Sequence, residues 1–331
     1  MPSAIGNLYI CSSELLKFKT MTENNSSNQV TRPIISILIP VYNYDCSALV
    51  KALLTQCDSL RAHHNASCEI IVGDDASDKG HGIEHVKDVC EEGHCRFFAE
   101  EKHAGRARHR NNMAREATGE YLLFIDCDAI VSHDDFLEKY YQWAKHGEDV
   151  VVGGIAAVTS LPSPDYSLRF RYEQEATSIR SVRYRKAHEY LHLSTFNFMI
   201  KRDIFTRIRF DERCRNYGFE DTLFGLQLKQ EGIHITHIDN TLIHNGLDTN
   251  DVFLNKTEES LRTLHSLGAD IQRFTHVGAS ADKLKKWNMD ASCRAFYKLF
   301  RRAMRSNLCG DNPSMTLFKL YKLGYYCSLN A

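Results

Sequence analysis

Asp126 and Asp128 are separated by one residue and directly follow the apolar run Tyr121–Ile125. Two carboxylates at this spacing on a turn can hold a hard divalent cation, Mg²⁺ or Mn²⁺, which then bridges to the phosphates of a substrate. Aspartate is also favoured in turns and at helix N-termini, so an isolated pair of this kind more often shapes a turn than binds a metal. Only the surrounding polar residues can decide between these two interpretations.

Polar residues also follow two earlier apolar runs of the chain. Tyr42 and Asn43 come after the first run, and Asp74 and Asp75 come after the second. Asp and Asn are ordinary turn residues, so any one of these positions would indicate little by itself. Acids and amides that follow three separate runs indicate a site where the runs end.

The apolar runs are bounded by turn residues and have the length of buried strands: Ile35–Val41, Glu69–Val72, Cys95–Ala99, Tyr121–Ile125 and Val150–Val158. Stretches of helix length separate them, among them Ser47–Leu60 and Gly105–Thr118. This alternation predicts an α/β fold with a mostly parallel sheet flanked by helices. In such sheets ligands bind beyond the carboxyl ends of the strands, which is where the polar residues fall.

The remaining segments are expected to be a charged helical stretch, an apolar run, a further helix and a basic amphipathic helix, over Leu168–Tyr190, Ser194–Ile200, Glu220–Gln230 and Lys283–Arg305. Residues 1–32 lack sustained periodicity and end in a polar run, which predicts a loose leader. We therefore divide the chain into a leader over 1–32, a main domain over 33–268 and a basic helical extension over 269–331.

Composition narrows the class of protein. The 331 residues include 41 Lys plus Arg against 42 Asp plus Glu, so there is no global electrostatic reason to expect a nucleic-acid partner. No apolar run reaches the roughly 18 residues of a membrane-spanning helix. The 11 cysteines are scattered singly and form no disulfide framework, which favours a reducing compartment. We expect a cytoplasmic protein.

Five motifs, in their order along the chain, resemble the family 2 glycosyltransferases: Pro40-Val41-Tyr42-Asn43, Val72 to Ser77, Gly105 to Asn111, Asp126-Cys127-Asp128 and Gly218-Phe219-Glu220-Asp221. The resemblance spans roughly Ile34 to Leu264, most of the chain. It implies a GT-A fold, which is a Rossmann-like, mixed but mostly parallel sheet, here with a C-terminal helical appendage. It also implies an inverting hexosyl- or N-acetylhexosaminyltransferase that uses a nucleotide diphosphate donor and a divalent metal.

The resemblance assigns donor binding to Pro40, Tyr42, Asp75, Arg110 and Asp126. By it, Tyr42 would line the base pocket and Asp75 would accept from N3 of a uracil-type base, which favours UDP. Asp126 would contact the ribose or the waters of the metal. A guanidinium at Arg110 suits a pyrophosphate or a base edge, with Arg108 as its competitor, and Asp74 can instead shape the turn.

The resemblance also supplies metal ligands and catalytic residues. Asp128 would bind the metal directly, and His244 would complete the site, which favours Mn²⁺ over Mg²⁺ because imidazole suits manganese better. Asp221 would be the catalytic base, since an acceptor hydroxyl is a poor nucleophile until a carboxylate takes its proton. Glu220 would hydrogen-bond the acceptor. Both acids also stand at an expected helix start, where carboxylates commonly act as caps.

The expected partners are a nucleotide-sugar donor and a glycan or lipid-linked acceptor in polysaccharide synthesis, with no nucleic acid. The basic helix at the C-terminus leaves two interpretations open: it lies on anionic lipid at the inner face of the plasma membrane, or it packs Phe296 and Phe300 on the main domain. A non-catalytic or degenerate sugar-nucleotide-binding protein and a nucleotidyltransferase are the rival functions. The latter would want a Gly-rich phosphate loop, which Pro40 to Cys46 lacks.

Overall fold

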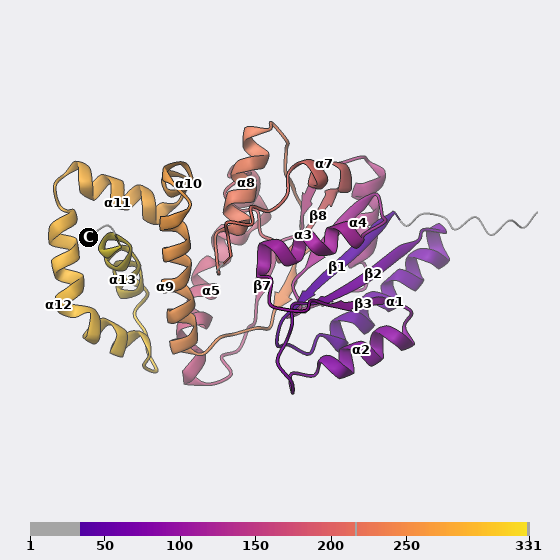
Figure 1. The fold of residues 1–331 in the computed structure, drawn as a ribbon, viewed down its shortest axis with the longest axis horizontal. Coiled ribbons are helices and arrows are strands. Elements are labelled where there is room, and N and C mark those ends of the chain that lie inside the picture. The colour runs from indigo at the N-terminus through magenta and orange to yellow at the C-terminus, as the bar shows by residue number, and fades with distance from the viewer. Residues whose placement is uncertain (1–33, 216, 330–331) are drawn as a thin grey trace, which may run out of the picture. The chain divides into compact units, whose positions relative to one another are not determined.

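The computed structural model describes residues 34–215 and 217–329, so the predicted leader over 1–32 lies outside the described residues (Figure 1). A seven-stranded sheet forms the centre of the fold. Its strands are, in spatial order, β3 (Arg96–Ala99), β2 (Cys68–Asp74), β1 (Ile35–Val41), β4 (Tyr121–Ile125), β8 (Asn197–Lys201), β6 (Val150–Val152) and β9 (Thr236–His237). The first four predicted strands are thus confirmed as β1 to β4, apart from shifts of a few residues at their ends.

The sheet is mixed but mostly parallel, as the alternation of strands and helices predicts. Strand β1 pairs in parallel with β2 and β4, β2 with β3, and β6 with β9, whereas β8 runs antiparallel to both of its neighbours. Because β1, β2 and β4 are parallel, their carboxyl ends share one edge of the sheet. The residues that follow these strands are therefore close in space.

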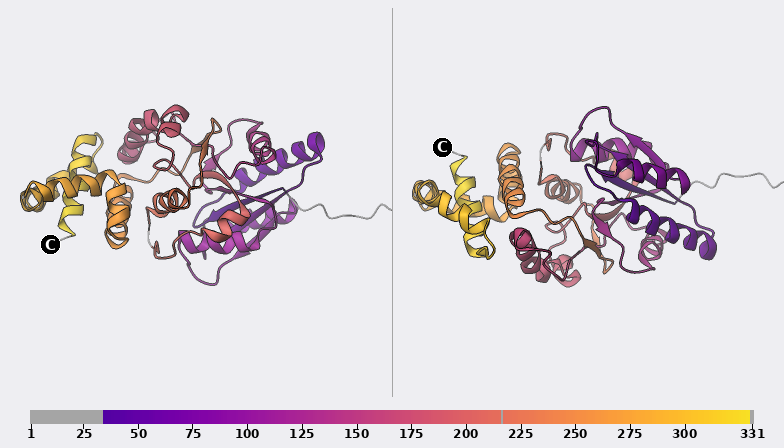
Figure 2. Two further views of the ribbon diagram at one scale, coloured as in Figure 1. Left: turned by 90° about the horizontal axis from the view of Figure 1, so that it is seen from above. Right: turned by 90° about the horizontal axis from the view of Figure 1, so that it is seen from below.

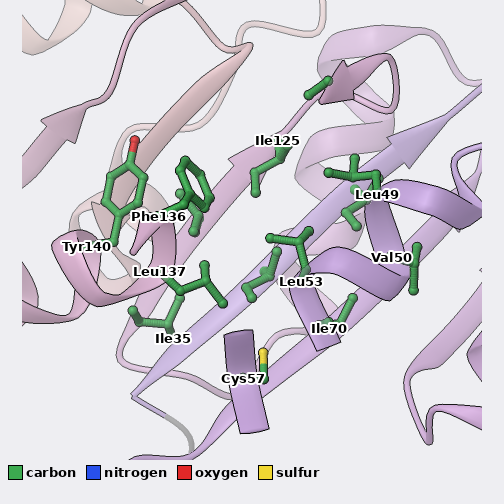
Figure 3. Close-up of a cluster of buried hydrophobic side chains, with 14 of the residues drawn as sticks. Ile35, Leu49, Val50, Leu53, Cys57, Ile70, Ile125, Phe136, Leu137 and Tyr140 are labelled. Carbon is green, nitrogen blue, oxygen red and sulfur yellow. The ribbon is translucent and has the colours of Figure 1, made fainter. Parts of the chain in front are cut away.

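Helices cover both faces of the sheet (Figure 2). On one face lie α1 (Ser47–His64), α2 (Ile83–Glu92) and α4 (Phe136–Lys145), and on the other lie α3 (Arg106–Glu116), α7 (Arg202–Arg207) and α8 (Glu220–Gln230). Figure 3 shows part of the first core, where Leu53 and Phe136 pack against Ile35 and Ile125 with no solvent exposure. Alternate residues of each strand fill the two cores, which explains why the strands read as continuous apolar runs.

A small second sheet lies beside the carboxyl edge and consists of β5 (Ala129–Ile130), β10 (Leu242–His244) and β7 (Ile155–Ala157). The prediction of one strand over Val150–Val158 is wrong, because β6 and β7 belong to different sheets. Two glycines make the break. A side chain at Gly153 would come within 2.4 Å of the Asn240 carbonyl oxygen, and Gly154 has a φ of +99°, a backbone conformation that favours glycine.

The charged stretch Leu168–Tyr190 forms two helices, α5 (Ser167–Arg180) and α6 (Val182–Ala187), preceded by a short 3₁₀-helix, η1 (Pro164–Tyr166). The break falls at Ser181, which leaves helical geometry and whose hydroxyl accepts from the backbone N–H of Tyr184 to cap α6. Capping by a serine side chain satisfies one of the free N–H groups of the new helix.

The C-terminal part is helical: α9 (Asn250–Ser266), α10 (Ala269–Phe274), α11 (His276–Lys286), α12 (Asp290–Leu308) and α13 (Met315–Ser328). A third core, which includes Leu168, Phe253, Tyr297 and Phe318, joins α5, α9, α12 and α13. This core crosses the predicted boundary at residue 268, which stays a prediction.

The expectation of a single basic helix over Lys283–Arg305 is wrong. The chain leaves helical geometry between Trp287 and Met289, where Asn288 takes a left-handed φ of +55°, so α11 ends and α12 begins within the predicted range. In α12 the side chains of Phe296 and Phe300 stay 47% and 44% exposed. None of the helices in the described part of the chain is long and apolar enough to cross a membrane.

Candidate active site

The two aspartates after β2 have different surroundings. Asp74 Oδ1 accepts from the backbone N–H of Ser77 at 3.1 Å and from its hydroxyl at 2.5 Å, so this carboxylate closes the turn. Asp75 is 4% exposed, and its oxygens accept from the backbone N–H groups of Ala104 at 2.6 Å and Gly105 at 3.1 Å. Asp75 thereby holds the loop that leads into α3. Its carboxylate keeps lone pairs for a further donor, because it offers about four acceptor positions.

An aromatic surface lies beside Asp75. Pro40 pairs in register with Gly73, and Tyr42 follows directly after the last residue of β1, Val41. The Tyr42 ring is 45% exposed and lies 4.5 Å from the ring of His103, whose Nδ1 is 3.1 Å from Asp75 Oδ2. An open ring next to a buried carboxylate can stack on a flat heterocycle while the acid accepts from its N–H groups.

The structure distinguishes the two candidate arginines of α3. Arg110 is 2% exposed, with Nη2 2.5 Å from Asp126 Oδ1 and Nη1 3.6 Å from Glu220 Oε1. Its Nε and Nη1 have no hydrogen-bond partner among the described residues. Arg108 is exposed and lines a separate cavity of about 550 Å³ with Glu100 to Gly105 and Glu212 to Arg215. Arg110, and not Arg108, therefore connects the acid after β4 with the acidic pair of α8.

Asp128 and His244, which are 116 positions apart in the sequence, lie side by side. His244 Nε2 is 3.2 Å from Asp128 Oδ2, and His244 Nδ1 is 3.0 Å from Glu173 Oε1. Burial alone would lower the pKa of His244, but the two carboxylates outweigh it and raise that pKa to about 9. Burial would likewise raise the pKa of Asp128, yet the contact with His244 holds it below the ordinary value.

The second sheet creates this proximity. Strand β10 runs antiparallel to β5 and places His244 opposite Ala129, the residue after Asp128. The backbone N–H of Asn245 donates to the Asp128 carbonyl oxygen at 2.9 Å. At Gly246 a side-chain carbon would fall 2.0 Å from Asp128 Oδ2, so only glycine lets the chain pass this carboxylate.

These residues suit an open site for a divalent cation. Among the described residues, no group of three or more His, Cys, Asp or Glu side chains is arranged to hold a metal by itself. Mg²⁺ and Mn²⁺ are commonly bound by one or two carboxylates together with substrate phosphates and waters. The buried Asp128 Oδ1 has no hydrogen-bond partner among the described residues, and Glu173 lies on the far nitrogen of His244, where a ligating histidine usually meets a carboxylate.

Glu220 and Asp221 form the first turn of α8. The preceding residues, Gly218 and Phe219, have φ values of +98° and +65°, and Phe219 is thus a bulky residue held in left-handed geometry. Any side chain at Gly218 would lie 2.5 Å from Ser260 Cβ, so the turn is packed tightly against α9. Backbone strain of this kind is concentrated at functional sites, where the surrounding structure holds a side chain in one orientation.

Glu220 is buried, whereas Asp221 beside it is only partly buried. Glu220 is 5% exposed and meets Arg106 Nη1 at 3.8 Å in addition to Arg110. Asp221 Oδ1 accepts from the backbone N–H of Thr222 at 2.6 Å. Burial first, and then the charge of Glu220, raise the pKa of Asp221 to about 6. A carboxylate whose pKa is raised toward neutrality is a stronger base than an exposed one.

The sequence analysis missed Glu173 and Arg169 of α5. Glu173 has no solvent exposure, and Arg169 Nε donates to its Oε1 at 2.7 Å. In sequence, an arginine and a glutamate four residues apart in a charged helix look like an ordinary exposed ion pair. Only the packing of α5 against β7 and α9 shows that the pair is buried beside His244.

Comparisons with known proteins identify related sequences and a related fold. Residues 36–209 match the family described as Glycosyl transferase family 2. The chain is 29% identical to Glycosyltransferase GlyA of Streptococcus pneumoniae serotype 4 over 36% of this chain and 16% of that protein. It is 26% identical to the Minor teichoic acid biosynthesis protein GgaB of Bacillus subtilis over 59% of this chain and 21% of that protein. The chain thus spans about a fifth or less of the length of these two relatives.

A solved structure has the same fold. The mannosyltransferase PcManGT from Pyrobaculum calidifontis, in complex with GDP-Man and Mn²⁺, superposes with a TM-score of 0.51 at 14% sequence identity. The superposition covers 90% of this chain and 85% of the other. The mixed α/β architecture described above, with its C-terminal helices, is that of a GT-A glycosyltransferase.

Proposed function

The chain belongs to glycosyltransferase family 2, and we propose that it moves a sugar from a nucleoside diphosphate to an acceptor hydroxyl with inversion at the anomeric carbon. The observation that carries the proposal is the position of Arg110. Its buried guanidinium lies between Asp126, at the carboxyl edge of the sheet, and Glu220, beside the candidate base. The guanidinium of Arg110 thus lies between the residues that would bind the donor and the residues that would activate the acceptor.

Donor binding is assigned to the carboxyl edge of β1, β2 and β4. Tyr42 offers an exposed ring for the base, and the remaining lone pairs of Asp75 accept from the N3–H of uracil, which favours UDP. Pro40 lies next to the last residue of β1, and Asp126 faces the ribose or the waters of the cation. The unpartnered Nε and Nη1 of Arg110 are donors suited to a diphosphate oxygen.

The cation is assigned to Asp128 and His244, with Glu173 on the far nitrogen of the imidazole. A bound Mn²⁺ or Mg²⁺ would neutralise charge on the diphosphate leaving group. An imidazole ligand favours Mn²⁺, and the relative PcManGT is solved with Mn²⁺. Without a metal ion, His244 is protonated between the carboxylates of Asp128 and Glu173, and its positive charge offsets part of their negative charge.

Transfer proceeds as a single displacement. A new bond forms between the acceptor oxygen and the anomeric carbon while the bond from that carbon to the diphosphate oxygen breaks. Asp221 takes the proton of the acceptor hydroxyl, and the bonding electron pair leaves with the nucleoside diphosphate. Glu220, held by Arg106 and Arg110, orients the acceptor and keeps the pKa of its neighbour raised.

Thermal-shift measurements on the full chain test the donor and the cation together. The melting temperature is compared with UDP, GDP, CDP or NAD, each with and without Mn²⁺. A ligand that binds only the folded state must raise the melting temperature by mass action. We expect UDP to stabilise the protein strongly only with Mn²⁺. If none of the nucleoside diphosphates raises the melting temperature, the proposal fails.

The exposed apolar residues of α12 extend the proposal to where the protein acts, which is a membrane surface. Tyr297, Met304 and Leu308 pack inward, whereas Leu299 is 74% exposed. Exposed apolar and basic residues adjoin it along the same helix: Phe296, Phe300, Lys298, Arg301 and Arg302. An apolar stripe flanked by cations suits the interface of an anionic bilayer. We place this helix, at the edge of the fold away from the large sheet, on such a surface (Figure 1).

A further inference from the structure

A cavity of about 350 Å³ lies between the start of α8 and the C-terminal helices. Tyr217, Phe219 and Thr222 form one wall, and the others include Phe253 of α9 and Lys322 of α13. The volume falls in the range of small-molecule sites. The residues assigned above to the donor and the cation do not line this cavity, so the proposed reaction leaves its role open.

Two chains of contacts join the cavity to the candidate active site. Thr222 lines the cavity, and its backbone N–H donates to Asp221 Oδ1 at 2.6 Å. Arg169 also lines the cavity and pairs at 2.7 Å with Glu173, which lies 3.0 Å from His244. The cavity wall therefore includes the residue next to the candidate base and the ion-pair partner of Glu173.

The walls suit a sugar ring. Aromatic side chains supply flat apolar faces, and hydroxyl groups supply hydrogen-bond partners: Tyr172, Tyr217, Phe219, Phe253, Phe274, Phe318, Thr222, Thr257, Ser260 and Thr275. A pyranose presents C–H groups on its faces and hydroxyls at its rim, so rings on the walls with scattered hydroxyls match both.

The charged side chains that line the cavity are all positive. Arg169 and Lys322 line it, and no carboxylate does. Lys322 Nζ lies 4.7 Å from the ring centroid of Phe318 and 5.5 Å from that of Tyr172, and it pairs with no carboxylate of the described residues. One turn earlier on α13, by contrast, Lys319 Nζ meets Glu175 at 3.1 Å. A half-buried ammonium without a counterion is a site for an anion.

We propose that this cavity is the acceptor subsite and that it takes a phosphorylated sugar, with the phosphate on Lys322 and the ring against the aromatic walls. The assignment to an acceptor rests on the proposed function, because Thr222 in the cavity wall is the neighbour of the candidate base Asp221. The phosphate has two chemical sources: a free sugar phosphate, or the diphosphate that links a glycan to a lipid.

Calorimetric titration of the full chain with UDP and Mn²⁺ tests the proposal. The probes are N-acetylglucosamine 1-phosphate, its farnesyl diphosphate counterpart and the neutral sugar. We expect Lys322→Met to weaken both phosphorylated probes about tenfold or more, since it removes a charged contact, and Lys322→Arg to keep most of the affinity. Lys319→Met, on the same helix, is the matched control and should bind as the wild type does. Tighter binding of the farnesyl probe assigns the lipid-linked source, and equal binding assigns the free one.

Two results would overturn the subsite. One is equal affinity of the wild type for the neutral and the phosphorylated sugar, and the other is an equal loss in Lys322→Met and Lys319→Met. UDP binding is measured in the same samples as a separate readout. A wild type that binds phosphorylated sugar but not UDP would keep the cavity as an anion site and refute the glycosyl transfer instead.

Discussion

Asp221→Asn is expected to make the protein more stable while it removes glycosyl transfer. The folded protein raises the pKa of Asp221 from an ordinary value of 3.8 to about 6, so ionising this partly buried side chain costs the folded state up to about 3 kcal/mol at neutral pH. Asparagine has the same shape, carries no charge and still accepts from the N–H of Thr222. In a cooperative transition of a chain of this size, that energy corresponds to a rise of about 3 to 5 °C in the melting temperature.

The gain in stability must depend on pH in one direction. Because the folded state holds the proton more tightly than the unfolded state, the wild type loses stability as the pH rises from about 4 to about 6, and the variant does not. The difference between the two proteins should therefore be small at pH 4 and complete at pH 7.5. A carboxylate with a lowered pKa would show the opposite trend.

The assay is thermal unfolding of both proteins across this pH range, together with calorimetric titration of UDP and Mn²⁺ at pH 7.5. Asp311→Asn is the matched control, because Asp311 is exposed in the loop before α13 and should change stability by less than about 0.5 kcal/mol. Unchanged UDP binding by Asp221→Asn separates the loss of the base from damage to the donor site.

The reasoning is refuted if Asp221→Asn melts at or below the temperature of the wild type at pH 7.5. A rise of equal size at pH 4 and pH 7.5 would also refute it, since the gain would then come from packing or hydrogen bonding and not from a relieved charge. Retained transfer by the variant would remove Asp221 from the role of base.

Four further predictions follow from the same geometry. Glu220→Gln removes the charge of Glu220, which is the second cause of the raised pKa of Asp221. The acidic limb of the pH profile of kcat/KM should therefore move from about pH 6 to lower pH. If the limb does not move, it belongs to another group. Asp128→Ala should abolish the effect of Mn²⁺ on UDP affinity in calorimetry, whereas Asp221→Asn should retain it; equal losses would contradict the division of roles. Glu173→Gln should weaken Mn²⁺-dependent UDP binding about tenfold, because Glu173 supports His244, and an equal loss without Mn²⁺ would indicate a damaged fold instead. Leu299→Ser should reduce sedimentation of the protein with phosphatidylglycerol vesicles, whereas Leu320→Ser, which changes an exposed leucine of α13, should not. If the two variants behave identically, α12 is not the membrane-binding helix.

Much of the fold follows from local patterns of the sequence. Apolar runs bounded by turn residues predict β1, β2, β3 and β4, and the runs are longest in β1 and β4, where both faces of the strand are buried. The same pattern does not predict the second sheet. Gly153 and Gly154 split one apolar run between two sheets, and the reason, a close approach to Asn240, is a contact across 87 positions of the chain.

The choice between two arginines shows the limit of local pattern in the site. Arg108 and Arg110 lie in one motif, and both are charged residues of the same helix. Which guanidinium reaches Asp126 and Glu220 depends on the face of α3 that packs on the sheet, and this is decided by the other elements.

The sequence alone determined which residue types stand after each strand and at the start of α8, because turn chemistry and strand length are local properties. The tertiary structure decided their partners: His244 lies beside Asp128, Glu173 lies on the far side of His244, and Lys322 meets no carboxylate of the described residues. Burial sets the electrostatics of these groups, and burial depends on elements that are distant in sequence. For that reason the raised pKa of Asp221 and the cavity proposed as an anion site are visible only in the packed structure.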